Sequence, residues 1–320
     1  MLVNTKKMLI NAQKNKYAVG AFNFTNIMQM KTILKVANDL NSPVILSASS
    51  GALKFIGADI IVSVAKTLEK QYNIDFAIHL DHGTSFEICK LAIDSGFTSV
   101  MIDASMHSID ENIKITNQVI KYAKMYNVTT EAELGVLAGV EDNIKNEKSL
   151  LTDPNESYHF IKKTNVDSLA ISIGTSHGAY KFKGTPNLDF SRLKEIKNKI
   201  NTPLVLHGAS SLDNRLISEP FKNSGGKLEN AKGVPLEMLI NAVDNGICKI
   251  NIDTDLRVSY TTGLRKALNN CSEFNIRKYQ KEGLDQMSII VAYLIENVVK
   301  SSNKNTWYFI PCTFYNILYF

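Results

Sequence analysis

Eight short apolar runs, each followed by a longer segment of helical periodicity, constrain this 320-residue chain more than any other feature. Most of the runs are continuously apolar rather than alternating, which is typical of parallel strands buried on both faces. Eight strand-then-helix units in one chain predict an α/β fold, a single-domain (β/α)8 or TIM barrel. The runs are residues 18–22, 43–48, 76–80, 98–102, 128–134, 168–173, 203–206 and 247–252.

The segments between the runs repeat apolar residues at spacings of three and four, as amphipathic helices do. Residues 109–123 are a clear case, because Ser108 and Glu111 form a capping box at their start. The other predicted helices are residues 27–40, 59–72, 87–95, 155–164, 188–200, 235–245 and 256–269. Two long polar stretches, 138–154 and 212–233, are predicted to be loops, and long loops in a compact domain are often lids.

A doubly wound parallel sheet is the alternative architecture for such an alternation. That fold would need a glycine-rich phosphate-binding turn after its first strand. Residues 21–24 instead read Ala-Phe-Asn-Phe, so the barrel is favoured.

Charge and cysteine content exclude several classes of function. Lys and Arg number 36 against 31 Asp and Glu, a net charge of +5 spread along the chain, which could favour small anionic molecules but gives no basic block for nucleic acid. The four cysteines lie far apart with no C-x-x-C pair, which argues against a disulfide scaffold or a cysteine zinc ribbon. No signal-peptide core and no run of roughly 18 apolar residues is found, so we expect a cytoplasmic protein without a membrane partner.

The C-terminal segment differs from the rest of the chain in composition. Residues 305–320 contain seven aromatic residues but are interrupted by Pro311 and Asn316. We therefore divide the chain into a barrel over residues 1–300 and an aromatic tail over residues 301–320, whose role is unknown and which would serve packing or contact between subunits.

Polar and ionisable side chains follow the predicted strands at the end where TIM barrels carry their chemistry. Buried charges need partners or a metal. Three of these residues, His82, His177 and His207, come from different strands and could converge on one ion. Three neutral imidazoles with one open position are typical of a catalytic zinc site. The remaining strand-end residues are Asn23, Ser49, Asp81, Asp103, Glu133, Asn251 and Asp253.

Features that suit a phosphate group cluster after the last strands, where this barrel usually binds one. Residues 208–211 (Gly-Ala-Ser-Ser) follow the seventh strand, and residues 251–254 (Asn-Ile-Asp-Thr) lead into a helix whose N-terminus exposes free N–H groups. Gly178 and Lys181, after the sixth strand, could add an N–H and an ammonium donor.

At these residues the chain resembles the class II, metal-dependent fructose-bisphosphate aldolases over roughly residues 1–300. The motifs that carry the resemblance are 77–83 (AIHLDHG), 131–135 (EAELG), 174–181 (GTSHGAYK), 205–211 (VLHGASS) and 249–257 (KINIDTDLR). The resemblance implies a zinc-dependent lyase of glycolysis and gluconeogenesis. It would cleave fructose 1,6-bisphosphate reversibly into dihydroxyacetone phosphate and glyceraldehyde 3-phosphate.

The resemblance also implies a role for each matched residue. His82, His177 and His207 would hold the catalytic Zn²⁺, and Asp103 and Glu133 would form a second, alternative metal position. Asp81 would be the acid/base at the aldehyde oxygen, and Glu141 the loop base that removes the ketone-side proton. A monovalent cation could accompany the zinc. The residues implied in substrate binding are Ser49, Gly178, Lys181, Gly208, Ala209, Ser210, Asn251, Ile252, Asp253, Thr254 and Arg257.

These residue types suit the reaction. Cleavage of the C3–C4 bond leaves an enediolate, whose charge zinc would stabilise as a Lewis acid. Asp81 adjoins the ligand His82 and so stays within reach of the C4 hydroxyl proton. Glu141, on a predicted loop, could be brought to a dry site by loop closure.

The choice of substrate depends on residues 253–257. Their Asp-Thr-Asp-Leu-Arg form resembles the fructose-bisphosphate enzymes more than the tagatose-bisphosphate enzymes, which remain the alternative. Arg257 would then meet the far phosphate. The chain departs from the family at Leu284, where an arginine that often reaches the far phosphate across a homodimer or homotetramer contact is expected.

Three other functions stay open on the residues alone. A Schiff-base aldolase would need a desolvated lysine at the barrel mouth, and Lys181 is the nearest candidate. A metal hydrolase of this fold often carries two histidines one residue apart on the first strand, where this chain has Asn23 between two phenylalanines. A binding protein without catalysis is the third.

Overall fold

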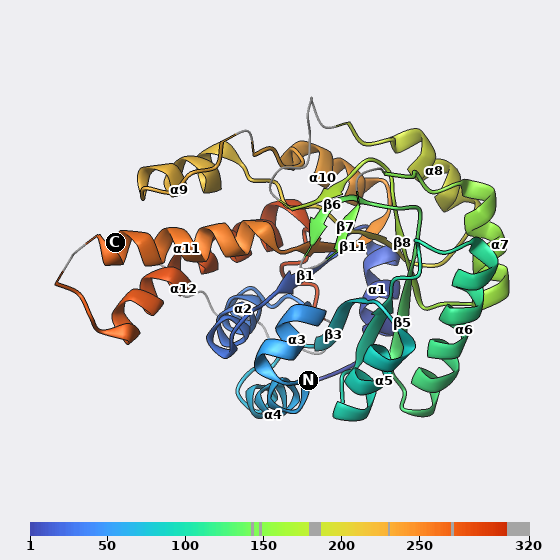
Figure 1. Ribbon diagram of the computed structural model, residues 1–320, viewed down its shortest axis with the longest axis horizontal. Coiled ribbons are helices and arrows are strands. Elements are labelled where there is room, and N and C mark those ends of the chain that lie inside the picture. The colour runs from blue at the N-terminus through green and yellow to red at the C-terminus, as the bar shows by residue number, and fades with distance from the viewer. Residues whose placement is uncertain (142–143, 147–148, 179–186, 230, 270–271, 306–320) are drawn as a thin grey trace.

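Eight parallel strands close into a barrel in a computed structural model that describes residues 1–141, 144–146, 149–178, 187–229, 231–269 and 272–305 (Figure 1). The order around the barrel is β1-β11-β10-β8-β5-β4-β3-β2. Because β1 pairs with both β2 and β11, the sheet has no edge there, and the doubly wound alternative is wrong. All eight predicted strands are confirmed, as β1 (Val19–Asn23), β2 (Val44–Ser49), β3 (Phe76–Gly83), β4 (Ser99–Ile102), β5 (Thr129–Leu134), β8 (Ser168–Ile171), β10 (Leu204–Leu206) and β11 (Ile247–Ile252).

The eight predicted helices are also present, and they surround the barrel (Figure 1). Several start where a short polar side chain caps the first turn, as Ser108 does by accepting a hydrogen bond from the Glu111 backbone N–H. They are α2 (Ile27–Asp39), α4 (Ala58–Glu69), α5 (Phe86–Ser95), α6 (Ile109–Met125), α7 (Pro154–Thr164), α8 (Phe190–Lys199), α10 (Leu236–Asp244) and α11 (Thr254–Leu268).

One helix that the sequence patterns did not predict closes the N-terminal end of the barrel. The stripe of Met8, Leu9 and Ala12 on α1 (Thr5–Asn15) packs in one cluster with Val19 and Ile45 from the barrel strands. The remaining residues of α1 are largely polar, so its single narrow apolar stripe is a weak signal of amphipathicity.

The two predicted loops contain regular structure, so that prediction is wrong in part. The first holds β6 (Ala138–Glu141) and β7 (Ile144–Asn146), an antiparallel pair, and β6 also pairs in parallel with β9 (Ser176–His177). The second holds a π-helical turn, η1 (Asn214–Ser218), and α9 (Glu219–Asn223). A three-stranded sheet beside the barrel mouth therefore joins the segment after β5 to the segment that carries His177.

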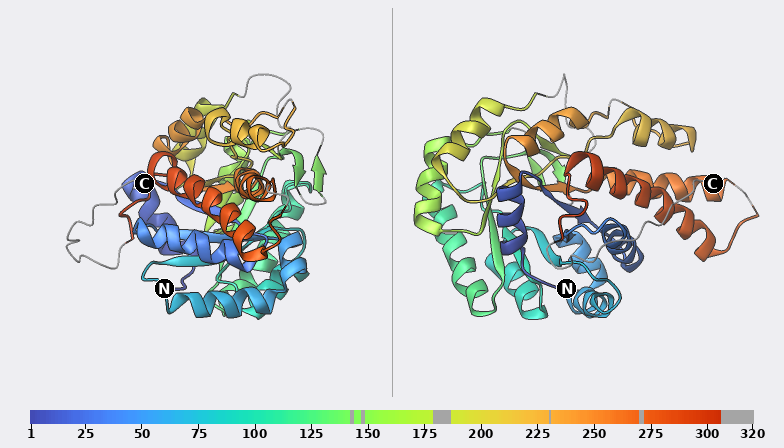
Figure 2. Two further views of the ribbon diagram at one scale, coloured as in Figure 1. Left: turned by 90° about the vertical axis from the view of Figure 1, so that its left-hand side faces the viewer. Right: turned by 180° about the vertical axis from the view of Figure 1, so that it is seen from behind.

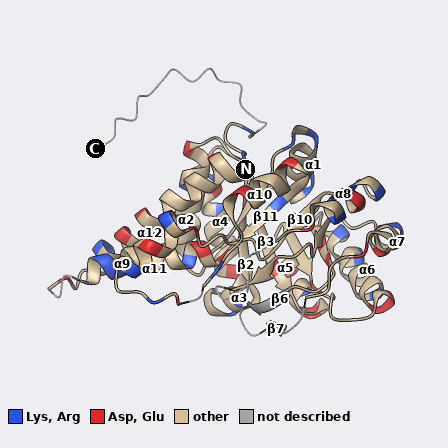
Figure 3. Ribbon diagram, turned by 90° about the horizontal axis from the view of Figure 1, so that it is seen from above, with Lys and Arg blue, Asp and Glu red and all other residues tan. Residues whose placement is uncertain are grey.

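A helical arm projects from the barrel (Figures 1 and 2). It consists of α11 and α12 (Ile276–Tyr293), the latter also missed from the sequence. The two helices approach so closely at Gly263 that a Cβ there would lie 2.1 Å from the backbone oxygen of Glu282. Lys and Arg are intermixed with Asp and Glu over the outer helices (Figure 3).

Three further elements complete the fold. A short helix, α3 (Ser50–Ile56), follows β2, and a π-helical turn, η2 (Leu294–Val298), follows α12. Beyond it, Ser301 is buried and its hydroxyl lies 2.7 Å from that of Ser42, so the first residues of the predicted tail pack on the barrel. Residues 306–320 lie outside the described part. Among the described helices none has the length and apolar content needed to cross a membrane.

The barrel interior changes from apolar to polar along its axis. Beside the α1 contact it is lined by Val19, Ile45 and Ala77. Polar side chains follow towards the C-terminal ends of the strands, and all of them are buried: Ser47, His79, Ser99, Glu131 and Lys249, then Asn23, Asp81, Glu133, His207 and Asn251.

Candidate active site

Three imidazole rings meet at the C-terminal mouth of the barrel, as the sequence predicts. His82 is the penultimate residue of β3, His207 follows β10, and His177 lies on β9. The ring centroids of His82 and His207 are 4.5 Å apart, those of His82 and His177 4.9 Å, and those of His177 and His207 6.5 Å. The Nε2 atom of His82 lies 3.0 Å from Nδ1 of His207.

Carboxylates behind two of these rings determine which nitrogens face each other. His82 Nδ1 lies 3.0 Å from Asp103 Oδ2, and His207 Nε2 lies 2.8 Å from Glu131 Oε1. A ring nitrogen beside a carboxylate carries its proton, so the other nitrogen of each neutral ring presents a lone pair. Burial lowers the pKa of His207, and His82 lowers it further, which keeps the ring neutral.

Two lone pairs 3.0 Å apart repel unless a cation lies between them. The donor arrangement therefore fits a divalent ion such as zinc, which prefers imidazole nitrogen. Ligand atoms of Asp81, His82 and His207 lie within 4.8 Å of one another, as do those of His82, Asp103 and Glu133. His82 thus belongs to both groups. The first contains Asp81 in place of the predicted ligand His177, which is in neither group.

The backbone at His82 is unusual. Its φ of +48° is a left-handed conformation that a non-glycine residue seldom adopts, and the pairing of β3 with β4 shifts register between Leu80 and Gly83. A Cβ on Gly83 would lie 2.5 Å from the Met101 oxygen, so this bulge requires glycine. Strain of this kind persists where the surrounding structure fixes it, and here it directs His82 towards the other imidazoles.

Asp81 is held between two amides. Asn23 Nδ2 donates to its Oδ2 at 2.7 Å, and Asn251 Nδ2 donates to its Oδ1 at 2.9 Å. The side chain is buried, and Oδ1 lies 3.7 Å from His207 Nδ1. With both oxygens acting as acceptors beside the metal-ligand cluster, the carboxylate is placed to take up a proton from a bound hydroxyl.

The loop after β10 is fixed by a carboxylate that the sequence analysis did not single out as a site residue. Asp255 is fully buried and accepts hydrogen bonds from the backbone N–H groups of Ser211 and Leu212, both at 2.8 Å. Gly208, with φ +60°, packs so tightly that a Cβ would lie 2.6 Å from the Ser176 oxygen. The loop is thereby anchored both to the start of α11 and to β9.

The sequence profile of the family described as fructose-bisphosphate aldolase class-II matches residues 3–304. This chain belongs to the class II fructose-bisphosphate aldolase family. It is 48% identical over 283 residues to a fructose-bisphosphate aldolase of Helicobacter pylori, covering 87% of this chain and 92% of that one. It is 43% identical over 291 residues to a Giardia intestinalis enzyme of the same name, covering 90% of each.

Solved structures agree on the fold. A putative fructose-1,6-bisphosphate aldolase from Coccidioides immitis superposes with a TM-score of 0.78 at 25% identity, over 93% of this chain and 96% of that one. The YdjI aldolase from Escherichia coli K12 gives the same TM-score at 24% identity, over 96% and 100%. Family membership makes the chain a lyase and removes the hydrolase and non-catalytic alternatives.

The other residues implied in substrate binding lie around the mouth of this aldolase barrel. Ser49 ends β2, caps α3 and is paired in register with Asp81. Gly178 follows β9 with φ +82°. Ala209, Ser210 and Ile252 are buried, and Thr254 begins α11, whose start has no side-chain cap.

Two of the predicted site residues cannot be placed fully. Lys181 lies outside the described residues. Glu141 ends β6, but its side chain is likewise not described. The pairing of Gly139 with His177 nevertheless brings the backbone of β6 next to the histidine cluster.

Arg257 and Leu284 have contacts of their own. Arg257 donates from Nε to Asp253 Oδ1 at 2.7 Å, and its side chain is 46% exposed. Leu284, at the position of the expected arginine, packs its half-buried side chain against the hydrophobic core. The apolar contact explains how the leucine is accommodated.

A buried lysine inside the barrel was missed by the sequence analysis. Lys249 is fully buried, and its ammonium donates to both carboxylate oxygens of Glu131, at 2.9 and 2.8 Å. A period-two pattern could have revealed both residues, because Glu131 precedes Glu133 and Lys249 precedes Asn251 by two positions on the same inward face.

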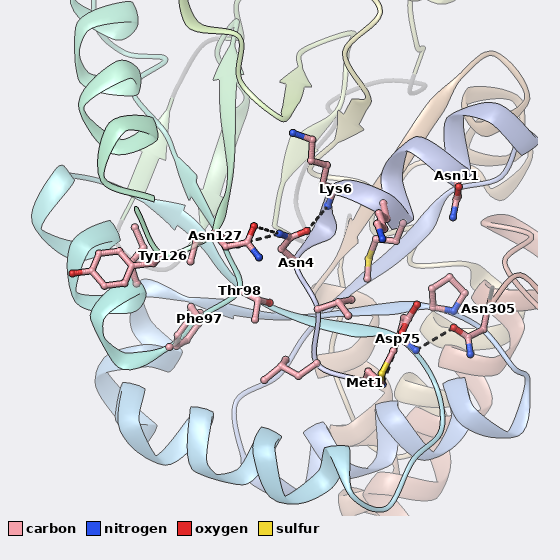
Figure 4. A pocket seen from close by; sticks show the side chains of 18 of the residues that line it. Met1, Asn4, Lys6, Asn11, Asp75, Phe97, Thr98, Tyr126, Asn127 and Asn305 are labelled. Atoms are coloured by element: carbon pink, nitrogen blue, oxygen red, sulfur yellow. Dashed lines mark hydrogen bonds and ion pairs between the residues drawn. The ribbon is translucent and has the colours of Figure 1, made fainter. Parts of the chain in front are cut away.

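The opposite end of the barrel holds a cavity of about 710 Å³ (Figure 4). Residues that line it include Asn4, Phe97, Tyr126, Asn127 and Asn305, and Asn4 Nδ2 donates to the Asn127 carbonyl at 3.0 Å. No residue of the histidine cluster lines this cavity.

Proposed function

We propose that this chain catalyses the reversible cleavage of fructose 1,6-bisphosphate into dihydroxyacetone phosphate and glyceraldehyde 3-phosphate, with Zn²⁺ held by His82, His177 and His207. The observation that carries the proposal is the 3.0 Å approach of two imidazole nitrogens, each backed by a carboxylate, beside the buried Asp81. Family membership supports the reaction type.

Zinc bound here would supply a Lewis-acid charge at the ketose carbonyl oxygen, where negative charge develops during cleavage. Asp103 and Glu133, with His82, would form the second metal position. Burial alone would raise the pKa of Asp103, but hydrogen bonds from His82 and Ser105 hold that pKa well below its usual range, so a charged ligand is available.

Asp81 would take the proton of the C4 hydroxyl during cleavage and return it during condensation. The amides of Asn23 and Asn251 support this role, because they fix the carboxylate without supplying a competing proton acceptor at its oxygens. Glu141 would remove or restore the proton on the ketone half, which the pairing of β6 with β9 supports.

The phosphate of the dihydroxyacetone half would lie against residues 208–210, Gly178 and residues 251–254. The uncapped start of α11 supports this site, since free N–H groups at a helix N-terminus attract anions. Arg257 would meet the far phosphate by exchanging its present contact with Asp253.

Tagatose 1,6-bisphosphate is the alternative substrate, and it differs only in configuration at C4. The Asp253 to Arg257 sequence supports fructose. Side-by-side kinetics on the two sugars would decide, and a larger kcat/KM for the tagatose compound would reverse the assignment.

We also propose a cytoplasmic homodimer or homotetramer. Exposed apolar side chains at the arm support self-association, with Phe274 90% exposed and Ile276 57% exposed. The buried thiols of Cys89 and Cys248, which form no disulfide, suit a reducing compartment. Light scattering of the wild type and of Phe274→Asp would measure the assembly state.

The decisive experiment combines metal analysis with the cleavage assay. We expect one tightly bound zinc per chain, loss of cleavage on chelation and recovery on zinc addition. Asp81→Asn should keep the zinc but lower kcat by about 10²–10⁴-fold, the usual contribution of a general acid/base. Exposed Asp94→Asn is the matched control. Full activity in chelator, with borohydride trapping of substrate on a lysine, would contradict the proposal.

A further inference from the structure

A chain of buried polar groups runs from the middle of the barrel to the histidine cluster. Lys249 on β11 donates to both oxygens of Glu131 on β5, and its third neighbour is His79 Nε2 at 3.2 Å. Burial, with Lys249 next, lowers the pKa of His79 to about 3, so the ring is neutral and accepts from the ammonium. His79 Nδ1 then donates to Ser99 Oγ at 2.8 Å. All three N–H groups of the lysine therefore have acceptors.

Glu131 is held equally firmly. Besides Lys249, it accepts from Ser168 Oγ at 3.2 Å and from His207 Nε2 at 2.8 Å. These contacts give the carboxylate four hydrogen bonds, and the one from the side of the mouth comes from the ring of His207.

Stability alone is a poor explanation for this ion pair. Taking two charges out of water costs several kcal/mol per ion, and apolar replacement of buried pairs is often neutral or stabilising. This layer of a TIM barrel is ordinarily filled by branched aliphatic side chains, which the same strands could supply. The pair instead lies where the Glu131 carboxylate contacts the imidazole of His207.

We propose that Lys249 and Glu131 are positioning residues that fix the orientation and the tautomer of His207, so that its Nδ1 lone pair faces the metal site. This inference rests on the proposed function. Carboxylate partners of ligating histidines commonly change metal affinity by 10–100-fold. The lysine ammonium donates to both oxygens of Glu131 and so fixes the position of the carboxylate against the His207 ring.

The test uses two double variants that remove both charges and so leave no unpaired ion. Lys249→Met with Glu131→Gln keeps a neutral acceptor for His207, and Lys249→Met with Glu131→Leu removes the acceptor. Zinc affinity is measured by chelator competition, and the cobalt-substituted protein is examined by its visible spectrum. Lys300→Met, which breaks the exposed contact with Asp244, is the matched control.

We expect zinc affinity to fall by about 10-fold in the Gln variant and about 100-fold in the Leu variant, with altered cobalt bands, while the melting temperature does not follow that order. Equal zinc affinity in all folded variants would overturn the inference and leave the pair as core packing. A wild type that binds no zinc would instead overturn the proposed function.

Ser168→Ala provides a second variant if the double variants do not fold. It removes one hydrogen bond to Glu131 and leaves both charges in place. We expect zinc affinity to fall by about 3-fold, and an unchanged affinity and cobalt spectrum would count against the inference.

Discussion

The two ends of the barrel are built from the same eight strands, but one end is apolar and covered by a helix and the other holds buried polar groups. At the N-terminal end, α1 covers the opening with Met8, Leu9 and Ala12, and the interior is apolar. At the C-terminal end, Asp81, Glu133 and His207 are buried together, and His82 has a strained backbone. The contrast separates residues that stabilise the fold at the N-terminal end from residues at the C-terminal end that form the candidate active site.

This division assigns different consequences to mutations of similar burial. A substitution at the closed end should change the free energy of unfolding and leave the chemistry intact. A substitution at the mouth should change chemistry first, because polar groups there are paired with one another rather than packed against the core.

The largest effect is expected for His207→Ala at the mouth. Loss of one of the three predicted ligands should reduce zinc content and turnover together, with kcat/KM lower by about 10³-fold or more. Metal analysis and the cleavage assay on one preparation measure both. The exposed His159→Ala is the control. Normal turnover by a zinc-free His207→Ala protein would contradict the assignment of zinc-dependent chemistry to the mouth.

Leu9→Ala tests the closed end. Leu9 is fully buried in the α1 contact, so its truncation should cost about 2–5 kcal/mol of unfolding free energy through lost burial and a cavity. Denaturant unfolding measures the loss, and kcat at a temperature where the variant is folded should stay within twofold. A large fall in kcat would show that the two ends are coupled.

The smallest effect concerns pH and the polar layer between the two ends. His79 has a pKa of about 3 in the folded protein and an ordinary value near 6.5 when unfolded, so the unfolded state binds more protons between these values. Stability should therefore be full above pH 6.5 and fall as pH drops towards 3, by on the order of 2 kcal/mol at pH 5. Urea unfolding from pH 7 to 5 measures this, and His79→Gln should flatten the curve.

Much of the fold follows from the sequence because the barrel strands are continuous apolar runs. Strands β5 and β11 were predicted despite charged residues, since β-branched or apolar residues lie beside those charges. The elements missed have weaker signals. The stripe on α1 is narrow, α12 is rich in charged residues, and β9 is only two residues long.

The convergence of strand-end side chains at the candidate site was predictable, but the groups that contact them were not. The convergence of His82 with His207 follows from strand order once the barrel is assumed. The pairing of Lys249 with Glu131 depends on which strands face each other across the interior. A linear motif does not show which strands do so. Asp255 likewise acts on a loop more than 40 positions earlier in the chain.

The small sheet beside the mouth has a mechanical consequence. Because β6 pairs with β9, the strand that ends at Glu141 is hydrogen-bonded to the strand that carries His177. Displacement of one strand must either move the other or break the hydrogen bonds between them. The proposed zinc ligand His177 and the proposed base Glu141 therefore lie on hydrogen-bonded strands. A substitution that weakens this pairing should change zinc affinity and the rate of proton transfer together.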